Sequence, residues 1–266
     1  MADRPFDAKQ YWEQRLGSHE GLVGVGNLSL GPAYVPWLYR VRRRVFKRIV
    51  RSSGIDVDGA RVLDVGSGTG FYVDLWRSAG AGTVVATDLT EVAVDRLRAR
   101  GIRAEEVDIG ADGQIFDPGS FDVVSAFDVL FHVVDDDRYE QALRNVRRLL
   151  RPGGWFVFTD LPVASGSTRR AAHQVRRAES DVLQALERNG LRLETRMPSF
   201  VLMEAPAAAR RAIWPGVWKA LVLAPSRLPV VGPLLGPVLY PVELVLTRVI
   251  RRGASIQAFV CMREPD

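Results

Sequence analysis

The sequence predicts an α/β fold in which a seven-stranded, mostly parallel sheet carries helices on both faces. Between residues 59 and 205, short runs rich in β-branched and aromatic residues alternate with amphipathic segments of helical length. That alternation is typical of βαβ units. The first run ends in three closely spaced glycines, Gly66, Gly68 and Gly70. A chain of 266 residues with 47% hydrophobic content is also long enough to bury one large core.

Each element has its own local signal. Strands are expected at residues 61–65, 83–87, 103–107, 121–126, 155–160, 191–196 and 255–262, which have the composition of buried strands. Helices are expected at 72–79, 91–100, 137–150 and 176–188. The second of these begins after Thr90, a good N-cap residue, and ends at Gly101. The third has aspartates at its start and arginines toward its end, which suits the helix dipole.

The amino-acid composition along the chain divides it into four parts. Residues 1–58 are expected to form a helical lid, and residues 59–205 the sheet core. Residues 206–253 form a Pro-rich apolar insert, and residues 254–266 the final strand of the sheet.

Composition limits the function classes. One cysteine, Cys261, allows no internal disulfide and no zinc cluster of thiolates, and we expect no metal site. The first 16 residues contain charges and lack the apolar stretch of an export signal, so we expect a cytoplasmic protein. The net charge is +5 and almost all the cations are arginine, a skew that a GC-rich coding sequence explains without a nucleic-acid partner.

The glycine loop is the central motif. A buried strand runs through Asp64 and Val65 into Gly66-Ser67-Gly68-Thr69-Gly70 and then into a helix. Glycines let the backbone turn tightly and approach a ligand closely. The spacing is neither G-x-G-x-x-G nor the P-loop pattern. The charge of Asp64 is awkward beside a pyrophosphate and suits a ligand that carries an ammonium group and a sulfonium.

Two further acidic residues follow strands. Asp88 ends the second strand, where a carboxylate can accept hydrogen bonds from both hydroxyls of a ribose. Asp108 follows the third strand, where it can meet an adenine amino group while Ile109 packs on the ring.

These motifs together resemble the class I S-adenosylmethionine-dependent methyltransferases, whose core is Rossmann-like. The resemblance covers about residues 61–160 and rests on VLDVGSGTGFY, on Asp88, on VDIG at 107–110, on FDVVSAFDVLFHV at 121–133 and on LLRPGGWFVF at 149–158. It implies S-adenosylmethionine as the cofactor. The side chains and backbone that it implies around that cofactor are Tyr11 with Trp12 in the lid, Asp64, Gly66, Ser67, Gly68, Gly70, Asp88, Leu89, Asp108, Ile109, Phe127 and Asp128.

Methyl transfer needs an aligned acceptor and, for a hydroxyl, a base. The candidate catalytic residues are His132, Asp128 and His19. His132 follows the fourth strand, at the sheet edge where ligands bind, and its ordinary pKa suits proton transfer. A histidine that only shapes the cofactor site is the alternative. Asp160 is a weaker candidate base, and His173 is expected in solvent among arginines.

The two ends of the chain are expected to form the acceptor pocket. Residues 35–51 predict a helix with an apolar stripe and a basic face that we expect to be solvated. In the insert, prolines recur every four residues from Pro225 to Pro241, and Arg227 and Glu243 bound an uncharged stretch of 15 residues. A transmembrane helix is rejected, because spanning needs about 20 apolar residues and repeated Pro breaks a straight helix. The insert is then a lid, plain packing, or a peripheral contact with the inner face of the membrane through Arg248, Arg251 and Arg252.

The leading hypothesis is O-methylation of a small apolar metabolite, a sugar or a lipid-linked glycan, with N-methylation next. An alternative is a protein that binds S-adenosylmethionine without transferring methyl. Nucleic-acid methylation is disfavoured, because Ala126-Phe127-Asp128-Val129 replaces the [N/D]-P-P-[Y/F] motif and Cys261 lies in the last strand. A nicotinamide oxidoreductase is disfavoured by the glycine spacing. Monomer and homodimer both stay open.

Overall fold

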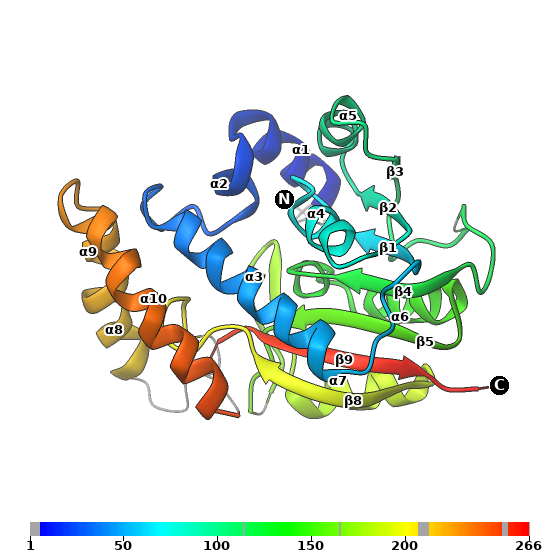
Figure 1. Ribbon diagram of the computed structural model, residues 1–266. Helices are drawn as coiled ribbons and strands as arrows, with labels where there is room; N and C mark the ends of the chain where they lie inside the picture. Colours follow the sequence, from blue (N-terminus) through cyan, green and yellow to red (C-terminus); the bar gives the residue numbers. More distant parts are fainter. Residues whose placement is uncertain (1–5, 114, 165, 207–212, 252–254, 266) are drawn as a thin grey trace, which may run out of the picture.

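The computed structural model describes residues 6–113, 115–164, 166–206, 213–251 and 255–265. Its main sheet confirms the predicted fold class (Figure 1). From one edge to the other it contains β3 (Ala104–Glu106), β2 (Thr83–Asp88), β1 (Arg61–Val65), β4 (Phe121–Ala126), β5 (Leu150–Asp160), β9 (Gln257–Arg263) and β8 (Leu191–Pro198). The first five strands are parallel, and β9 runs antiparallel to both of its neighbours.

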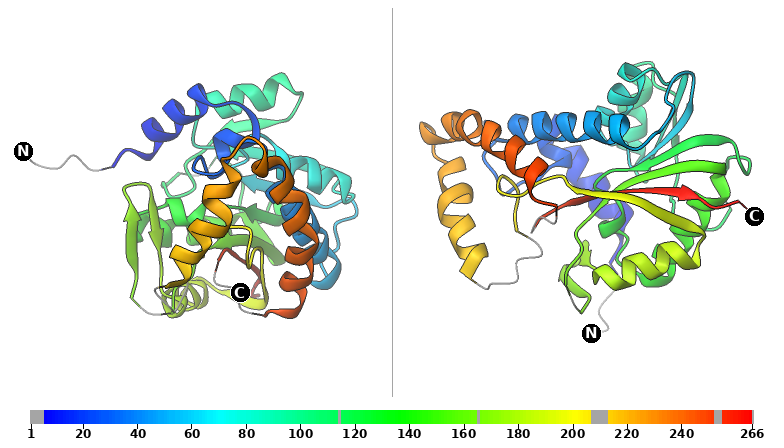
Figure 2. Two further views of the ribbon diagram at one scale, coloured as in Figure 1. Left: turned by 90° about the vertical axis from the view of Figure 1, so that its left-hand side faces the viewer. Right: turned by 60° about the horizontal axis from the view of Figure 1, so that its bottom comes forward.

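Helices cover both faces of this sheet (Figure 2). Adjacent residues of a strand point to opposite faces, so Val62 joins one apolar cluster and Leu63 the other. The first cluster contains α3 (Val35–Ser52), α4 (Phe71–Ser78) and α5 (Glu91–Ala99), and the second contains α6 (Asp136–Leu149) and α7 (Glu179–Arg188). Thr90 accepts a hydrogen bond from the Ala93 amide, as an N-cap residue does.

The N-terminal segment forms α1 (Ala8–Ser18) and α2 (Gly21–Val25) before α3. The Glu13 carboxylate accepts hydrogen bonds from the Glu91 and Val92 amides at the start of α5, at 2.6 and 3.4 Å. Arg96 donates to the Leu16 carbonyl at 2.8 Å. Both contacts tie α1 to α5 beside the carboxyl ends of the parallel strands.

One predicted helix is shorter than expected. Residues 168–176 form a hairpin of β6 (Thr168–Ala171) and β7 (Gln174–Arg176), and α7 begins only at Glu179. The arginines of this segment extended the apparent helical pattern, but Arg177 is buried against Asp136, at 2.8 Å, instead of lying on a helix surface. A short 3-10 turn, η1 (Leu130–His132), precedes α6.

The described part of the insert is helical. It contains α8 (Ile213–Trp218), the π-helical turn η2 (Lys219–Leu223), α9 (Ala224–Ser226) and α10 (Val231–Val249). The expectation that repeated prolines break the helix is wrong, because α10 continues through Pro237 and Pro241. Their spacing of four places both prolines on one side of the helix, and both are exposed, so the missing N–H groups lie on the side away from the core. Among the described residues, no helix is long and apolar enough to cross a membrane. Residues 207–212 and Arg252 lie outside the described part.

Helix α10 packs along α3, and the two lie side by side in Figure 1. Trp37 and Tyr240 place their ring centroids 5.5 Å apart. Arg48 donates to the Thr247 carbonyl at 2.8 Å and to the Pro198 carbonyl at 3.2 Å. The basic face of α3 is therefore not wholly solvated as expected, because Arg48 connects α3 to α10 and β8. Arg42 is also buried.

Candidate functional site

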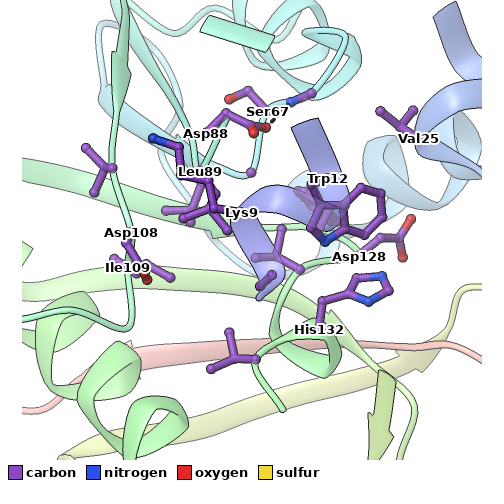
Figure 3. A pocket seen from close by; sticks show the side chains of 18 of the residues that line it. Lys9, Trp12, Val25, Ser67, Asp88, Leu89, Asp108, Ile109, Asp128 and His132 are labelled. Carbon is purple, nitrogen blue, oxygen red and sulfur yellow. Dashed lines mark hydrogen bonds between the residues drawn. The ribbon is translucent and has the colours of Figure 1, made fainter. Parts of the chain in front are cut away.

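A cavity of about 640 Å³ lies at the carboxyl ends of β1, β2 and β4, beside α1. Figure 3 shows two groups of side chains in it. Asp88, Leu89, Asp108 and Ile109 gather at one end, and Trp12, Asp128 and His132 gather at the other. The volume is in the range of pockets that hold a small-molecule ligand.

The glycine loop forms one wall of this cavity. Gly66 has φ +65°, and a Cβ added there would lie 2.4 Å from a methyl of Val129. The loop therefore needs glycine at this position both for its conformation and for its close approach to η1. Gly66, Ser67, Gly68 and Thr69 line the cavity. The last glycine, Gly70, does not line it and instead caps α4 with φ +79°.

Asp88 connects the glycine loop to the start of α5. Its carboxylate accepts hydrogen bonds from the Gly68 amide at 2.9 Å and from the Thr90 amide and hydroxyl at 3.1 and 2.7 Å. Burial raises the pKa of Asp88 above its ordinary value, and these hydrogen bonds oppose the rise. The side chain lies at the cavity wall, where its remaining lone pairs can accept further hydrogen bonds.

Asp108 and Ile109 close the same end of the cavity. The Asp108 carboxylate accepts a hydrogen bond from the Gly110 amide at 2.9 Å and pairs with Arg138 of α6. Ile109 is buried and lines the wall, as does Leu89 from the end of β2. Lys9 of α1 pairs with Glu106 beside them, and no sequence signal singled it out. This end offers apolar surface for a flat ring, with a carboxylate at its rim.

Asp64 lies beneath the glycine loop instead of facing the cavity. Its carboxylate accepts hydrogen bonds from the hydroxyls of Ser125 and Ser67, at 2.6 and 2.9 Å, and it is buried. Burial raises the pKa of Asp64 to about 7, although both hydroxyls oppose the rise. The expectation that its charge faces a cationic ligand does not match this geometry. Asp64 fixes the loop from below.

Asp128 stands at the opposite end from Asp88 and has an unusual backbone. Its φ is +61°, a left-handed conformation that Asp and Asn tolerate best among non-glycine residues. The Thr159 hydroxyl donates to its carboxylate at 3.0 Å, and the Arg42 guanidinium lies 3.0 Å from the other oxygen. Burial lowers the pKa of Arg42, but Asp128 and the smaller contributions of Tyr39, Tyr72 and Glu204 together outweigh burial, so the net pKa of Arg42 is raised. Sequence reasoning missed Arg42, because the helical pattern placed it on the basic face.

His132 faces this end of the cavity from η1. Its Nδ1 lies 2.6 Å from the His173 carbonyl oxygen. A carbonyl can only accept, so Nδ1 carries the hydrogen and Nε2 keeps a free lone pair. Burial lowers the pKa of His132 to about 4. The imidazole is therefore neutral near pH 7.

Aromatic rings of α1 pack against His132 and His173. The Trp12 ring stands edge-on to it, with centroids 4.9 Å apart. Tyr11 does not line the cavity and instead stacks on His173, with centroids 4.6 Å apart. The expectation that His173 is solvated is therefore wrong, because it fills the space between the hairpin and α1. His19 is exposed at the end of α1 and does not line the cavity.

A further aromatic wall lies between the glycine loop and α3. Phe127 stacks on Tyr72 with ring centroids 3.9 Å apart, and Tyr39 meets Phe71 edge-on at 4.9 Å. All four side chains line the cavity together with Val25. Sequence reasoning missed Tyr39, Phe71 and Tyr72. The position of Phe71 and Tyr72 directly after the glycines was the available signal.

The comparisons with known proteins agree on the family. Residues 63–158 match the methyltransferase domain family. A ubiquinone biosynthesis O-methyltransferase of Bordetella bronchiseptica is 33% identical over 120 residues, which are 42% of this chain and 47% of that protein. A ubiquinone/menaquinone biosynthesis C-methyltransferase of Idiomarina loihiensis is 38% identical over 120 residues, which are 42% and 46% of the two chains. The match thus covers about half the length of these relatives.

The fold extends beyond that match. The solved structure of the N-methyltransferase NodS from Bradyrhizobium japonicum, in complex with S-adenosylhomocysteine, superimposes with a TM-score of 0.59 at 16% identity. The superposition covers 98% of this chain and 100% of that one. At this identity the likeness concerns the fold alone.

Proposed function

Because the chain belongs to the class I S-adenosylmethionine-dependent methyltransferases, we propose that it transfers a methyl group from this cofactor to an oxygen of a small apolar acceptor. The observation that carries the proposal is the arrangement of one cavity. It joins a ribose-type carboxylate, Asp88, and a glycine loop at one end to a neutral imidazole with a free nitrogen, His132, at the other.

The residues of the cavity fit the cofactor. Asp88 is placed to accept hydrogen bonds from the two ribose hydroxyls, and Leu89 and Ile109 offer apolar faces to the adenine. Asp108, with Arg138 beside it, would meet the adenine amino group. The backbone at Gly66 and Gly68 leaves room that a side chain would fill, because a Cβ at Gly68 would lie 2.8 Å from Val25. Phe127 and Asp128 would flank the methionine portion, and Asp128 is the carboxylate that can hold its ammonium group.

S-adenosylmethionine, when bound, supplies an electrophilic methyl group on a positively charged sulfur. The protein's part is to hold the acceptor oxygen in line with that methyl, to exclude water and to take up one proton. His132 Nε2 is the acceptor of that proton in our proposal, while Nδ1 stays hydrogen-bonded to the His173 carbonyl. The hydroxyl proton becomes strongly acidic as the new oxygen–carbon bond forms, so even a weakly basic imidazole suffices.

The lining of the cavity supports an apolar acceptor rather than a sugar. The rings of Tyr39, Phe71 and Tyr72 and the side chain of Val25 line the cavity and offer apolar surface to an acceptor. Sugars are usually held by several polar side chains, and in our proposal Asp128 is already engaged by Arg42 and by the ammonium group of the cofactor. The relatives named as ubiquinone O-methyltransferases act on oxygen, which supports the same choice.

Calorimetry with S-adenosylhomocysteine and with NAD tests the cofactor assignment. We expect micromolar binding of S-adenosylhomocysteine and none of NAD. Asp88→Ala should weaken binding on the order of 100-fold, because each hydrogen bond to a charged group contributes about 1.5–3 kcal/mol. Asp95→Ala, which removes an exposed carboxylate of α5, is the matched control and should bind normally. Binding of NAD instead would overturn the proposal.

Transfer itself is measured with isotopically labelled S-adenosylmethionine and a panel of apolar hydroxylated compounds, with amines and sugars of similar size beside them. Label in a methyl ether supports the proposal. Label on nitrogen or carbon alone would retain the family and overturn the acceptor class.

A further inference from the structure

The insert between β8 and β9 exposes an unusual amount of apolar side chain. Val238 is 65% exposed and Val249 is 72% exposed. Most of the large hydrophobic side chains that are exposed in the described structure belong to this segment: Ile213, Trp214, Leu221, Leu228, Val230, Val231, Leu234, Val238, Val242, Val245 and Val249. Isolated exposed hydrophobic residues are ordinary, but a contiguous surface of this kind marks an interaction site.

Five of these residues follow one side of α10. Residues 234, 238, 242, 245 and 249 are spaced by three or four positions, so they share one face of a helix. The buried residues Gly232, Gly236, Glu243 and Thr247 follow the same spacing on the other side. At 100° per residue the two sets lie on roughly opposite faces. The apolar stripe therefore points away from α3 and from the rest of the molecule.

The helix that carries the stripe is held firmly in place. The Glu243 carboxylate accepts hydrogen bonds from the backbone amides of Val201, Leu202 and Met203, at 2.6, 2.9 and 3.0 Å. Gly236 lies so close to Trp37 that a Cβ there would be 2.2 Å from its ring. These contacts hold α10 in its orientation, so the helix cannot rotate to bury the stripe in the core.

Charge is distributed just as unevenly. The single acidic residue between 213 and 251 is Glu243, which is buried. The exposed charged side chains of that segment are Lys219, Arg227, Arg248 and Arg251. On the neighbouring α3, Arg40, Arg43, Arg44 and Lys47 are also exposed, and in the described structure none of the four pairs with a carboxylate. The Tyr240 hydroxyl accepts a hydrogen bond from Arg44 at 3.4 Å, which places these cations beside α10.

We infer that the outer face of α8–α10 docks on the surface of a lipid bilayer that contains anionic headgroups. The valines and leucines would enter the boundary of the acyl chains, and the exposed cations of the insert would meet the headgroups. An apolar face whose exposed charges are all cationic complements an anionic membrane better than a protein surface of mixed charge. The chain lies on the membrane and does not span it.

This docking also gives the acceptor a route to the site. A second cavity, of about 500 Å³, lies along the basic face of α3, whose Arg40, Arg43, Arg44 and Lys47 line it together with Tyr240 of α10. Tyr39 and Phe71 line both this cavity and the main one. An apolar acceptor dissolved in the bilayer would thus leave it next to the aromatic wall. The route rests on the proposed function, whereas the docking does not.

Flotation of the full chain with vesicles tests the docking. Phosphatidylcholine vesicles with about 30% phosphatidylglycerol, which have a negative surface potential, should bind the protein, and pure phosphatidylcholine should bind it much more weakly. Val238→Asp with Val242→Asp should reduce the partition coefficient at least tenfold. Lys219→Ala with Arg248→Ala should reduce it on the order of 25-fold, since each cation near an anionic surface contributes about fivefold.

Matched controls remove the same chemistry elsewhere. Ile115→Asp changes an exposed isoleucine far from the insert in sequence, and Arg103→Ala an exposed arginine beside β3. Both should bind vesicles like the natural protein. Circular dichroism and S-adenosylhomocysteine binding should be unchanged in every variant, which separates failure of docking from failure of the proposed function.

Three results would overturn the inference. They are equal binding to neutral and anionic vesicles, vesicle binding that the Val238 and Val242 changes leave intact, and no vesicle binding at all. A dimer seen by light scattering that those two changes dissociate, without vesicle binding, would assign the face to a second copy of the chain.

Discussion

The Arg42 guanidinium, carried by α3, lies 3.0 Å from the Asp128 carboxylate at the end of β4 and is almost fully buried by the contact. Asp128 itself lines the cavity. The pair therefore links the N-terminal segment to the sheet edge at the point where the methionine portion of the cofactor would lie. It also fixes a residue whose backbone is in the left-handed conformation.

Replacing Arg42 by Met should destabilise the protein by about 2–3 kcal/mol in denaturant unfolding. Loss of one partner from a fully buried pair costs about 3–5 kcal/mol, and Asp128 keeps some contact with solvent. Asp128→Asn is the companion variant, because Asn tolerates the same backbone conformation. If the two effects add fully in the double variant, the pair has no coupling and this account of it fails.

His132→Gln should lower kcat by about 10²–10⁴-fold, the usual contribution of a positioned base. Binding of S-adenosylhomocysteine should change little, because the proposed role concerns the acceptor proton. His19→Gln should leave kcat unchanged, since His19 lies outside the cavity wall. A loss of cofactor affinity in His132→Gln that matches the loss of rate would instead assign it to shaping the cofactor site.

The pH dependence of kcat/KM gives an independent test of His132. Burial lowers its pKa to about 4, so the imidazole is neutral and able to accept a proton at every pH well above that value. The acid limb of the profile should therefore lie near pH 4, and activity should be level between pH 6 and pH 8 as far as His132 governs it. A limb near pH 6.5 would contradict the buried, neutral imidazole.

Asp64 should make the folded state less stable as pH rises. Burial raises its pKa to about 7 in the folded state, while in the unfolded chain its pKa is near 3.8. The folded protein thus binds the extra proton between these values, and the stabilisation is lost as pH rises through 7. The free energy of unfolding of Asp64→Asn, taken relative to that of the natural protein, should therefore increase by about 3 kcal/mol from pH 5 to pH 8. Urea unfolding at both values measures it, and a constant difference would refute the shifted pKa.

Gly70→Ala should destabilise the fold, although Gly70 does not line the cavity. The residue has φ +79°, and an added Cβ would meet Leu97 at 2.9 Å and the Arg100 guanidinium at 2.6 Å. We expect a loss of about 1–3 kcal/mol, typical of a non-glycine residue in a strained conformation or an overpacked site. Thermal unfolding measures the loss. Cofactor affinity should be retained at temperatures where the variant is folded, and its selective loss would assign Gly70 to the pocket.

The sheet and one end of the site could be predicted because their signals are local. A run such as Arg61–Val65 followed by closely spaced glycines predicts a strand, a turn and a helix start, and Asp88 at the end of the next strand must lie beside that turn in a parallel pair. The prediction that the prolines of α10 break the helix was wrong, because the effect of a missing N–H depends on the side of the helix that it faces. The β6–β7 hairpin was missed for a similar reason, since it depends on contacts with Tyr11 and α1.

The sequence by itself determined the fold class, the glycine loop and the positions of Asp88 at the end of β2 and of Asp108 after β3, since strand alternation and turn chemistry act between near neighbours. Only the tertiary structure decided which charges meet and which faces stay open. Arg42 lies 86 residues from Asp128, and Arg48 199 residues from Thr247, along the chain. Burial is a property of the assembled molecule. The assembled molecule therefore places Asp64 beneath the loop and outside the cavity wall, keeps the buried His132 neutral, and leaves the outer face of α10 apolar and exposed.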